Sequence, residues 1–229
     1  MLENIVDYFT DAGVEVYLIL LVLVVLEAVL SADNAIALAA IAKSVKDPKS
    51  QQQALNIGLV GAYILRIALI FAATWVIKYW QFELLGAIYL LWLVYDYFST
   101  GEDQTEEERA LGFKSVWQIV PTIAITDLAF SLDSVTSAIA ITEDTWLIVA
   151  GGTMGIIILR FLAGLFIRWL QEYTYLEDAG FITVGFVGLR LLLKVGLPDY
   201  LIPEWVTIAV VAIFFTWGFS KKEEIKEEN

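Results

Sequence analysis

The sequence predicts an all-α, polytopic membrane protein with seven transmembrane helices, arranged as a 3+3 inverted repeat plus one extra helix. The first observation behind this prediction is composition: 59% of the 229 residues are hydrophobic and the mean hydropathy is +0.72, more than a soluble domain of this size carries. The second is a series of apolar segments of about 20 residues, the length that crosses a bilayer as a helix. The third is an internal repeat that places polar residues inside two of these segments.

The first repeat is expected over about residues 15–99, with three helices. Its first helix, about 15–42, is long enough to cross the membrane with some tilt. A polar loop over residues 43–53 separates it from a second helix over about 54–77, which closes on an aromatic belt. The third helix covers about 82–98, and the dense acidic stretch after it is expected to be a solvated loop.

The second repeat is expected over about residues 116–196, again with three helices. The first, about 117–141, carries Pro121 in its first turns. The next two, about 146–170 and 176–195, are rich in glycine, which at this spacing favours close helix packing. An extra helix over about 201–219 lies outside the repeat. The whole chain is expected to form a single membrane domain.

Two eight-residue stretches, residues 27–34 and 127–134, carry the clearest sign of the repeat. Each has a carboxylate, a serine, a second carboxylate, and an amide or hydroxyl at the same spacing. The matched pairs are Glu27 and Asp127, Ser31 and Ser131, Asp33 and Asp133, and Asn34 and Ser134. An odd number of helices in each unit inverts the second unit relative to the first, and inverted repeats place substrate sites near the membrane midplane.

A second match joins residues 58–66 with residues 152–160, which share two glycines, a leucine and a terminal arginine. These arginines are Arg66 and Arg160, and both are expected to support the acidic residues. A weaker match pairs Gly86 with Gly188.

Four carboxylates inside the predicted spans, Glu27, Asp33, Asp127 and Asp133, indicate a functional site. A charged side chain at the bilayer centre costs roughly 2.5 to 3.5 kcal/mol, so such residues are rare and mark ion or substrate pathways. Against the two matched arginines, the four acids leave a charge of −2. One divalent cation would neutralise it, and after that ion leaves, the paired carboxylates would hold protons instead. This favours exchange of a metal ion against protons.

The geometry of the first acidic stretch leaves two alternatives open. On a straight helix Glu27, Ser31 and Asn34 share one face, whereas Asp33 lies about 120° round from Glu27. Either Asp33 faces a neighbouring helix, or the helix unwinds around Ser31 to Asn34 so that both carboxylates converge, as broken helices do in transporters.

Composition also limits the chemistry of the site. The chain has no cysteine and no histidine, so a metal ion must be held by oxygen atoms, which favours Mn²⁺, Ca²⁺ or Mg²⁺ over Zn²⁺. No resident cofactor is expected, and the ion is cargo. The net charge of −13 argues against a nucleic-acid partner.

Positive charge predicts the orientation. With the amino terminus outside, only Lys78 and Lys194 fall in outside segments. The inside segments hold nine cations: Lys43, Lys46, Lys49, Arg109, Lys114, Arg168, Lys221, Lys222 and Lys226. The amino terminus is therefore expected outside and the carboxyl terminus inside.

The two acidic stretches, together with Gln53-Ala-Leu-Asn-Ile-Gly58 and Arg66, resemble the TerC family of integral membrane proteins over about residues 15–215. The resemblance implies a metal-ion exporter, most often of Mn²⁺, in a bacterial cytoplasmic membrane. The metal positions it implies are Glu27, Asp33, Asn34, Asp127, Asp133 and Ser134, with Ser31, Ser131, Arg66 and Arg160 in support.

Two other functions are weighed. A membrane scaffold or assembly factor, acting in metalation or insertion of exported proteins, is the alternative that the resemblance keeps open. An intramembrane aspartyl protease is disfavoured because the Gly-x-Gly-Asp half of its signature is missing, so no enzymatic activity is expected. The expected partners are a divalent ion and the bilayer, with association with other copies or with membrane-protein machinery left open. The sequence does not name the ion.

Overall fold

The computed structural model describes residues 13–45, 47–99, 116–197 and 202–222, and within these ranges the side chains of Asp33 and Glu204 lie outside the description. The predicted acidic loop after the third span and four of the cations used for orientation, Lys46, Arg109, Lys114 and Lys226, also lie outside it. The helices of the described part are α2 (Val14–Lys43), α3 (Pro48–Val76), α4 (Trp80–Ser99), α5 (Val116–Ile141), α6 (Thr145–Trp169), α7 (Leu176–Gly196) and α8 (Glu204–Gly218).

The all-α membrane fold is confirmed. Six helices, α2 to α7, are long and apolar enough to cross a membrane. Helix α8 is apolar too but has 15 residues, fewer than the roughly 20 that span a bilayer without thinning it. The expected count of seven spans is compatible with this arrangement.

Helix α3 begins at Pro48, six residues before the predicted start at residue 54. Asp47 caps it: Oδ2 accepts hydrogen bonds from the backbone N–H of Ser50 at 2.9 Å and from the Ser50 hydroxyl at 2.8 Å. These bonds hold the pKa of the Asp47 carboxyl below its usual range. Proline suits the first helical position, where its missing N–H has no partner to lose. The prediction of a loop over residues 43–53 is therefore wrong for its second half.

Both acidic stretches are continuous α-helix, over residues 27–34 in α2 and residues 127–134 in α5. The alternative in which the helix unwinds around the acidic motif does not occur in this structure. The alternative of a regular helix applies instead, and Glu27, Ser31 and Asn34 are all buried.

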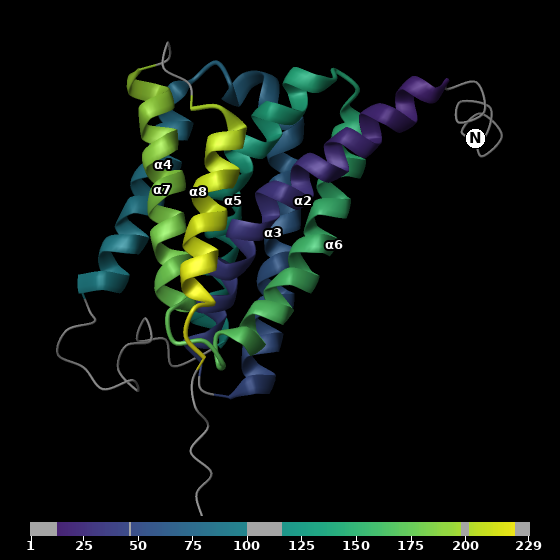
Figure 1. The fold of residues 1–229 in the computed structure, drawn as a ribbon. Helices are drawn as coiled ribbons and strands as arrows, with labels where there is room; N and C mark the ends of the chain where they lie inside the picture. The colour runs from purple at the N-terminus through teal and green to yellow at the C-terminus, as the bar shows by residue number, and fades with distance from the viewer. Residues whose placement is uncertain (1–12, 46, 100–115, 198–201, 223–229) are drawn as a thin grey trace, which may run out of the picture.

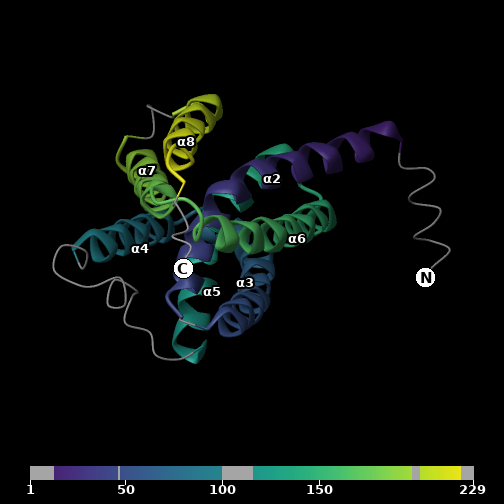
Figure 2. The ribbon, with the colours of Figure 1, turned by 60° about the horizontal axis from the view of Figure 1, so that its bottom comes forward.

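The helices pack in pairs: α2 lies mainly on α6, α3 on α5, and α4 on α7. Exchanging α2 with α5, α3 with α6, and α4 with α7 returns the same set of pairs, as a twofold relation between two three-helix units would. Helix α8 packs on α7 at the edge of the bundle, and the amino-terminal half of α2 leans outward beside α6 (Figures 1 and 2).

Glycines let the paired helices approach closely at two places whose contacted residues, Leu23 and Ile123, lie at related positions of the repeat. A Cβ atom added at Gly58 of α3 would lie 2.6 Å from the side chain of Ile123 in α5. One added at Gly151 of α6 would lie 3.0 Å from Cβ of Leu23 in α2. Leu23 and Ile123 are separated by 100 positions, the same separation as the acidic stretches.

Glycines also bring α4 close to α5 and α7 close to α2. Gly86 of α4 faces Leu132 of α5, where an added Cβ would meet Cδ1 at 3.0 Å, and Gly180 of α7 faces Ile36 of α2, where it would meet Cγ1 at 2.9 Å. Gly86 and Gly180 are 94 positions apart, the offset that also relates residues 58–66 to residues 152–160. Gly188 packs on α4 itself, and its weak match with Gly86 stays a prediction.

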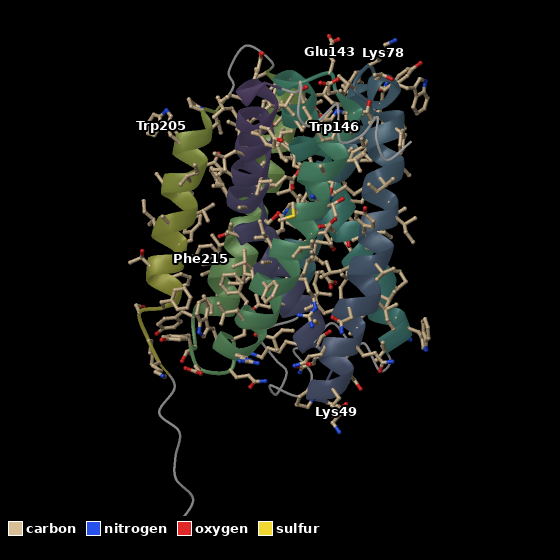
Figure 3. The ribbon with its side chains drawn as sticks, turned by 90° about the vertical axis from the view of Figure 1, so that its right-hand side faces the viewer. Lys49, Lys78, Glu143, Trp146, Trp205 and Phe215 are labelled. Atoms are coloured by element: carbon tan, nitrogen blue, oxygen red, sulfur yellow. The ribbon has the colours of Figure 1, made fainter. Side chains whose placement is uncertain are left out.

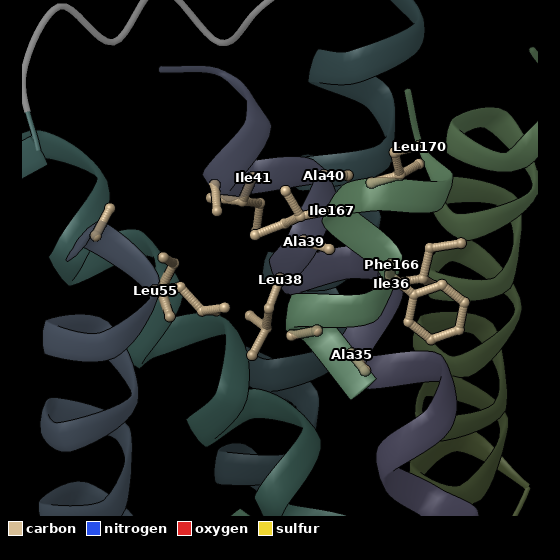
Figure 4. Packing of buried hydrophobic residues seen from close by; sticks show 14 of the residues in the cluster. Ala35, Ile36, Leu38, Ala39, Ala40, Ile41, Leu55, Phe166, Ile167 and Leu170 are labelled. Carbon is tan, nitrogen blue, oxygen red and sulfur yellow. The ribbon is translucent and has the colours of Figure 1, made fainter. Parts of the chain in front are cut away.

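Apolar packing fixes α2 on the carboxyl side of its acidic residues. Ile36 and Leu38 of α2 are fully buried, as is Leu55 of α3, and they belong to one cluster with Phe166 and Ile167 of α6 (Figure 4). This apolar cluster holds α2, α3 and α6 together next to the candidate site.

The two ends of the bundle are marked by charged residues. Lys49 lies at one end, and Lys78 and Glu143 lie at the other (Figure 3). The sequence predicts the first of these ends to be cytoplasmic and the second to be external.

Candidate metal-ion site

Two buried carboxylates from repeat-related positions share one arginine. Arg66 Nη1 of α3 donates to Glu27 Oε2 of α2 at 2.7 Å. Its Nη2 lies 3.3 Å from Oδ1 and 3.4 Å from Oδ2 of Asp127 in α5. The side chains are 1% exposed for Arg66, 6% for Glu27 and 0% for Asp127. Glu27, Arg66 and Asp127 are called the central cluster below, and their formal charges sum to −1.

The serines of the two repeats differ in their hydrogen bonds. Ser131 donates from Oγ to Asp127 Oδ2 at 3.3 Å. Ser31, its counterpart in α2, is also buried, but its Oγ has no hydrogen-bond partner among the described residues. The same holds for Nε of Arg66. The Oγ of Ser31 and the Nε of Arg66 are thus two buried polar groups that the described residues do not satisfy.

Two glycines of α6, Gly152 and Gly155, face the central cluster, so α6 projects no side chain at these two positions. A Cβ atom added at Gly155 would lie 2.7 Å from Glu27 Oε2, and one added at Gly152 would lie 3.6 Å from Cδ of Arg66. The missing Cβ at Gly155 is therefore what allows the Glu27 carboxylate to sit against the helix backbone.

Asp133, the second carboxylate of the α5 stretch, belongs to a different group of charges. Arg190 Nη1 lies 3.1 Å from its Oδ2, and Lys194 Nζ lies 3.1 Å from its Oδ1. Lys194 also pairs with Glu83 Oε1 at 2.9 Å. These residues, Glu83, Asp133, Arg190 and Lys194, are called the α4–α5–α7 cluster below, and their formal charges sum to zero.

Asp133 and Asp127 are six residues apart on one continuous helix, so the two positions are separated by about 9 Å along its axis. Within the described ranges no three Asp or Glu residues lie close enough together to hold one metal ion. The structure therefore brings together Glu27 and Asp127 of the predicted ligands, and it pairs Asp133 with cations of α7.

The remaining predicted residues have varied surroundings. Asn34 is buried next to the acidic stretch of α2, and Ser134 donates from Oγ to the carbonyl of Ser131 in its own helix at 3.5 Å. Arg160 donates from Nε to Asn56 Oδ1 and makes no described contact with a carboxylate. The side chain of Asp33 lies outside the described part of the structure.

Sequence reasoning missed the α4–α5–α7 cluster. It counted Lys194 among the external loop cations, whereas the structure places it in α7, paired with two carboxylates. One signal was available: Glu83 precedes Glu177 by 94 positions, and both form ion pairs. Glu177 pairs with Lys43 at 2.8 Å, at the other end of the bundle.

Comparison with known proteins identifies the family. The profile of the "Integral membrane protein TerC family" matches residues 12–224. The chain is 38% identical over 179 residues to "Uncharacterized membrane protein YceF" of Bacillus subtilis (strain 168), covering 74% of this chain and 68% of that protein. It is 36% identical over 208 residues to "Uncharacterized membrane protein YkoY" of the same organism, covering 81% and 63%.

A more distant relative is "Thylakoid membrane protein TERC, chloroplastic" of Arabidopsis thaliana, 25% identical over 224 residues, covering 85% of this chain and 58% of that protein. The chain thus spans less than two thirds of the length of this protein and of YkoY. No solved structure matches. With the profile matching nearly the whole chain and two bacterial relatives above 35% identity, this protein belongs to the TerC family of integral membrane proteins.

Proposed function

We propose that this protein transports a divalent metal ion, with Mn²⁺ as the leading candidate, and exports it from the cytoplasm in exchange for protons. The observation that carries the proposal is the central cluster. Two carboxylates from matched positions of the sequence repeat are buried at one point inside the membrane bundle, each less than a tenth exposed. Burying charge is costly, so such groups persist in membrane proteins mainly where ions pass.

The ligand set is made of hard oxygen donors. Glu27 and Asp127 offer carboxylate oxygens, Ser31 offers an unpaired hydroxyl among the described residues, and Asn34 is buried one turn further along α2. Oxygen ligands of this kind suit Mn²⁺, Mg²⁺ and Ca²⁺. We also propose Asp33 as a ligand, because the resemblance to the TerC family implies a metal position there. Since α2 is continuous and this position lies about 120° round from Glu27, Asp33 joins the site through a change in the conformation of α2.

The charge count supports exchange of one divalent ion for two protons. The α4–α5–α7 cluster is neutral by itself, so Asp133 is not available as free negative charge in this conformation. Glu27, Asp33 and Asp127 carry −3 against +1 on Arg66, which leaves −2. A divalent ion cancels this remainder, and two protons cancel it after the ion leaves.

A scaffold or assembly factor has no use for two carboxylates buried together inside the bundle, so nothing in the site favours that alternative. We place the protein in a bacterial cytoplasmic membrane with its amino terminus outside, since positive charge predicts this orientation.

The test is metal uptake into inverted membrane vesicles that contain the full chain, comparing Mn²⁺, Mg²⁺ and Ca²⁺ at several pH values. We expect uptake of Mn²⁺ above that of empty vesicles, driven by an outwardly directed proton gradient. Uptake no faster than in empty vesicles for all three ions would overturn the proposal.

A further inference from the structure

We propose that Arg66 is a resident occupant of the cation site and selects cations by charge: the transported ion must displace its guanidinium from Glu27 and Asp127. This deepens the transport function proposed above and rests on it. Arg66 thereby becomes a specificity-determining residue, which admits divalent ions and excludes monovalent ones.

The first step of the argument is competition for the same oxygens. Arg66 lies within 2.7 Å of Glu27 Oε2 and within 3.3 and 3.4 Å of the two oxygens of Asp127. A metal ion needs such oxygens at about 2.1 to 2.6 Å. An ion and a guanidinium cannot share them, because both are positive and the three side chains are buried.

The second step is that only the two carboxylates hold the guanidinium. Each hydrogen bond that Arg66 donates within the described ranges goes to Glu27 or Asp127, and its Nε has no partner there. Its aliphatic part lies against Gly152, which has no side chain to pin it. Once an ion takes the carboxylates, no other described contact keeps the guanidinium in place, and it can shift along the glycine face of α6.

The third step is the selection by charge. Arginine is always protonated in proteins, so an arriving monovalent ion only replaces one positive charge with another. The exchange also breaks the charge-assisted hydrogen bonds between the guanidinium and the carboxylates, which are strong. A divalent ion brings one more positive charge to the carboxylates and so gains Coulomb energy. Sodium and potassium are therefore excluded by the presence of the arginine, without any filter based on ion size.

The repeat-related arginine provides a contrast. Arg160 occupies the matching position of α6 but donates to Asn56, a neutral side chain. No described contact joins its guanidinium to a carboxylate. In this conformation Arg66 is therefore the arginine that competes with the ion for carboxylate oxygens.

The experiment measures Mn²⁺ binding to the purified full chain by the loss of the free Mn²⁺ EPR signal. Titrations are run in sodium chloride and in choline chloride at the same ionic strength of about 0.15 M. The proteins are the wild type, Arg66→Gln, Arg66→Lys and the control Arg168→Gln. Arg168 is an exposed arginine near the end of α6, so the control removes a guanidinium away from the central cluster.

For the wild type and for Arg168→Gln, we expect a Kd that changes less than about twofold between the two salts. For Arg66→Gln, we expect Mn²⁺ to bind at least about tenfold tighter in choline chloride, because the competitor is gone. Sodium should then compete at the vacated carboxylates and remove most of this gain. If Arg66 had only a structural role, replacing it would not make Mn²⁺ binding sensitive to sodium.

Arg66→Lys covers the case in which the neutral variant does not fold. Lysine keeps the charge but lacks the rigid planar fork with which Arg66 presents separate N–H groups to Glu27 and Asp127, so we expect Mn²⁺ affinity to rise by about threefold. Unchanged or weaker binding in the folded variants, or binding by Arg66→Gln that ignores sodium, would overturn the proposal. Failure of both variants to fold would assign Arg66 a structural role and would overturn it too. Failure of the proposed function is distinguishable, because it shows as absent Mn²⁺ flux in the wild type.

Discussion

Glu27 and Asp127, separated by 100 positions in the chain, accept hydrogen bonds from the same guanidinium, that of Arg66. The contact joins α2 of the first three-helix unit to α5 of the second through α3. Since both carboxylates are buried inside the bundle, this junction is the place where a change of packing between the two units would alter the site directly.

Because Glu27 packs against Gly155, we expect that adding one methyl group at position 155 strongly reduces transport. Gly155→Ala would place a Cβ 2.7 Å from Glu27 Oε2, so the carboxylate must move away from Arg66. We expect transport to fall at least about tenfold, with overpacking that costs about 1 to 3 kcal/mol of stability.

The matched control is Gly61→Ala, at the repeat-related position of α3. Its Cβ would lie 3.4 Å from Cβ of Ala124, an ordinary contact, and alanine favours helix by about 1 kcal/mol over glycine. Thermal unfolding and flux should both stay near wild type. Equal losses in Gly155→Ala and Gly61→Ala would show that the contact with Glu27 has no special role.

The α4–α5–α7 cluster predicts different costs for removing two lysines. Lys194→Met leaves Glu83 and Asp133 without their shared ammonium, inside a partly buried cluster. Lys43→Met removes the partner of a single, more exposed carboxylate, Glu177. We expect a loss of about 1 to 3 kcal/mol for Lys194→Met and under about 1 kcal/mol for Lys43→Met.

Thermal unfolding in detergent at constant pH would compare the two lysine variants. A melting temperature of Lys194→Met equal to that of Lys43→Met, or above it, would contradict the assigned pairing of Lys194 with two carboxylates.

The orientation can be tested cleanly because the chain has no native cysteine. Single cysteines at Lys49 and Glu143, which lie at opposite ends of the bundle (Figure 3), are expected to label from opposite sides. In intact cells an impermeant maleimide should react at position 143 and leave position 49 unmodified until the membrane is opened. The reverse pattern would invert the proposed topology.

Sequence alone predicted much of the fold because its signals are local. Apolar segments of membrane-spanning length gave the helices, and the boundaries agree within one or two residues for most of them. Helix α3 is the largest exception: its first turns, from Pro48, are polar, so a search for apolar residues began the helix too late. The cap at Asp47 and the proline after it were the signals that could have placed the start.

The site was only partly predictable, because a repeat gives positions and not conformations. Arg66 and Arg160 are equivalent in sequence, yet one bridges two carboxylates and the other donates to Asn56. A sequence repeat does not indicate which of two matched arginines contacts the buried carboxylates. The ion pairs of Asp133 depend on where α7 packs against α5, which is tertiary information. The convergence of Asp33 on the central cluster stays a prediction.

The most direct test of the central claim is Mn²⁺ flux through the reconstituted full chain against an imposed pH gradient, with the membrane potential clamped. The comparison is between the wild type, Asp127→Asn, and Asp144→Asn, which removes an exposed carboxylate that caps no helix through its side chain. We predict that wild-type and Asp144→Asn fluxes follow the gradient, and that Asp127→Asn, folded as the wild type, carries no flux. Full flux in Asp127→Asn, or wild-type flux that ignores the pH gradient, would contradict the account.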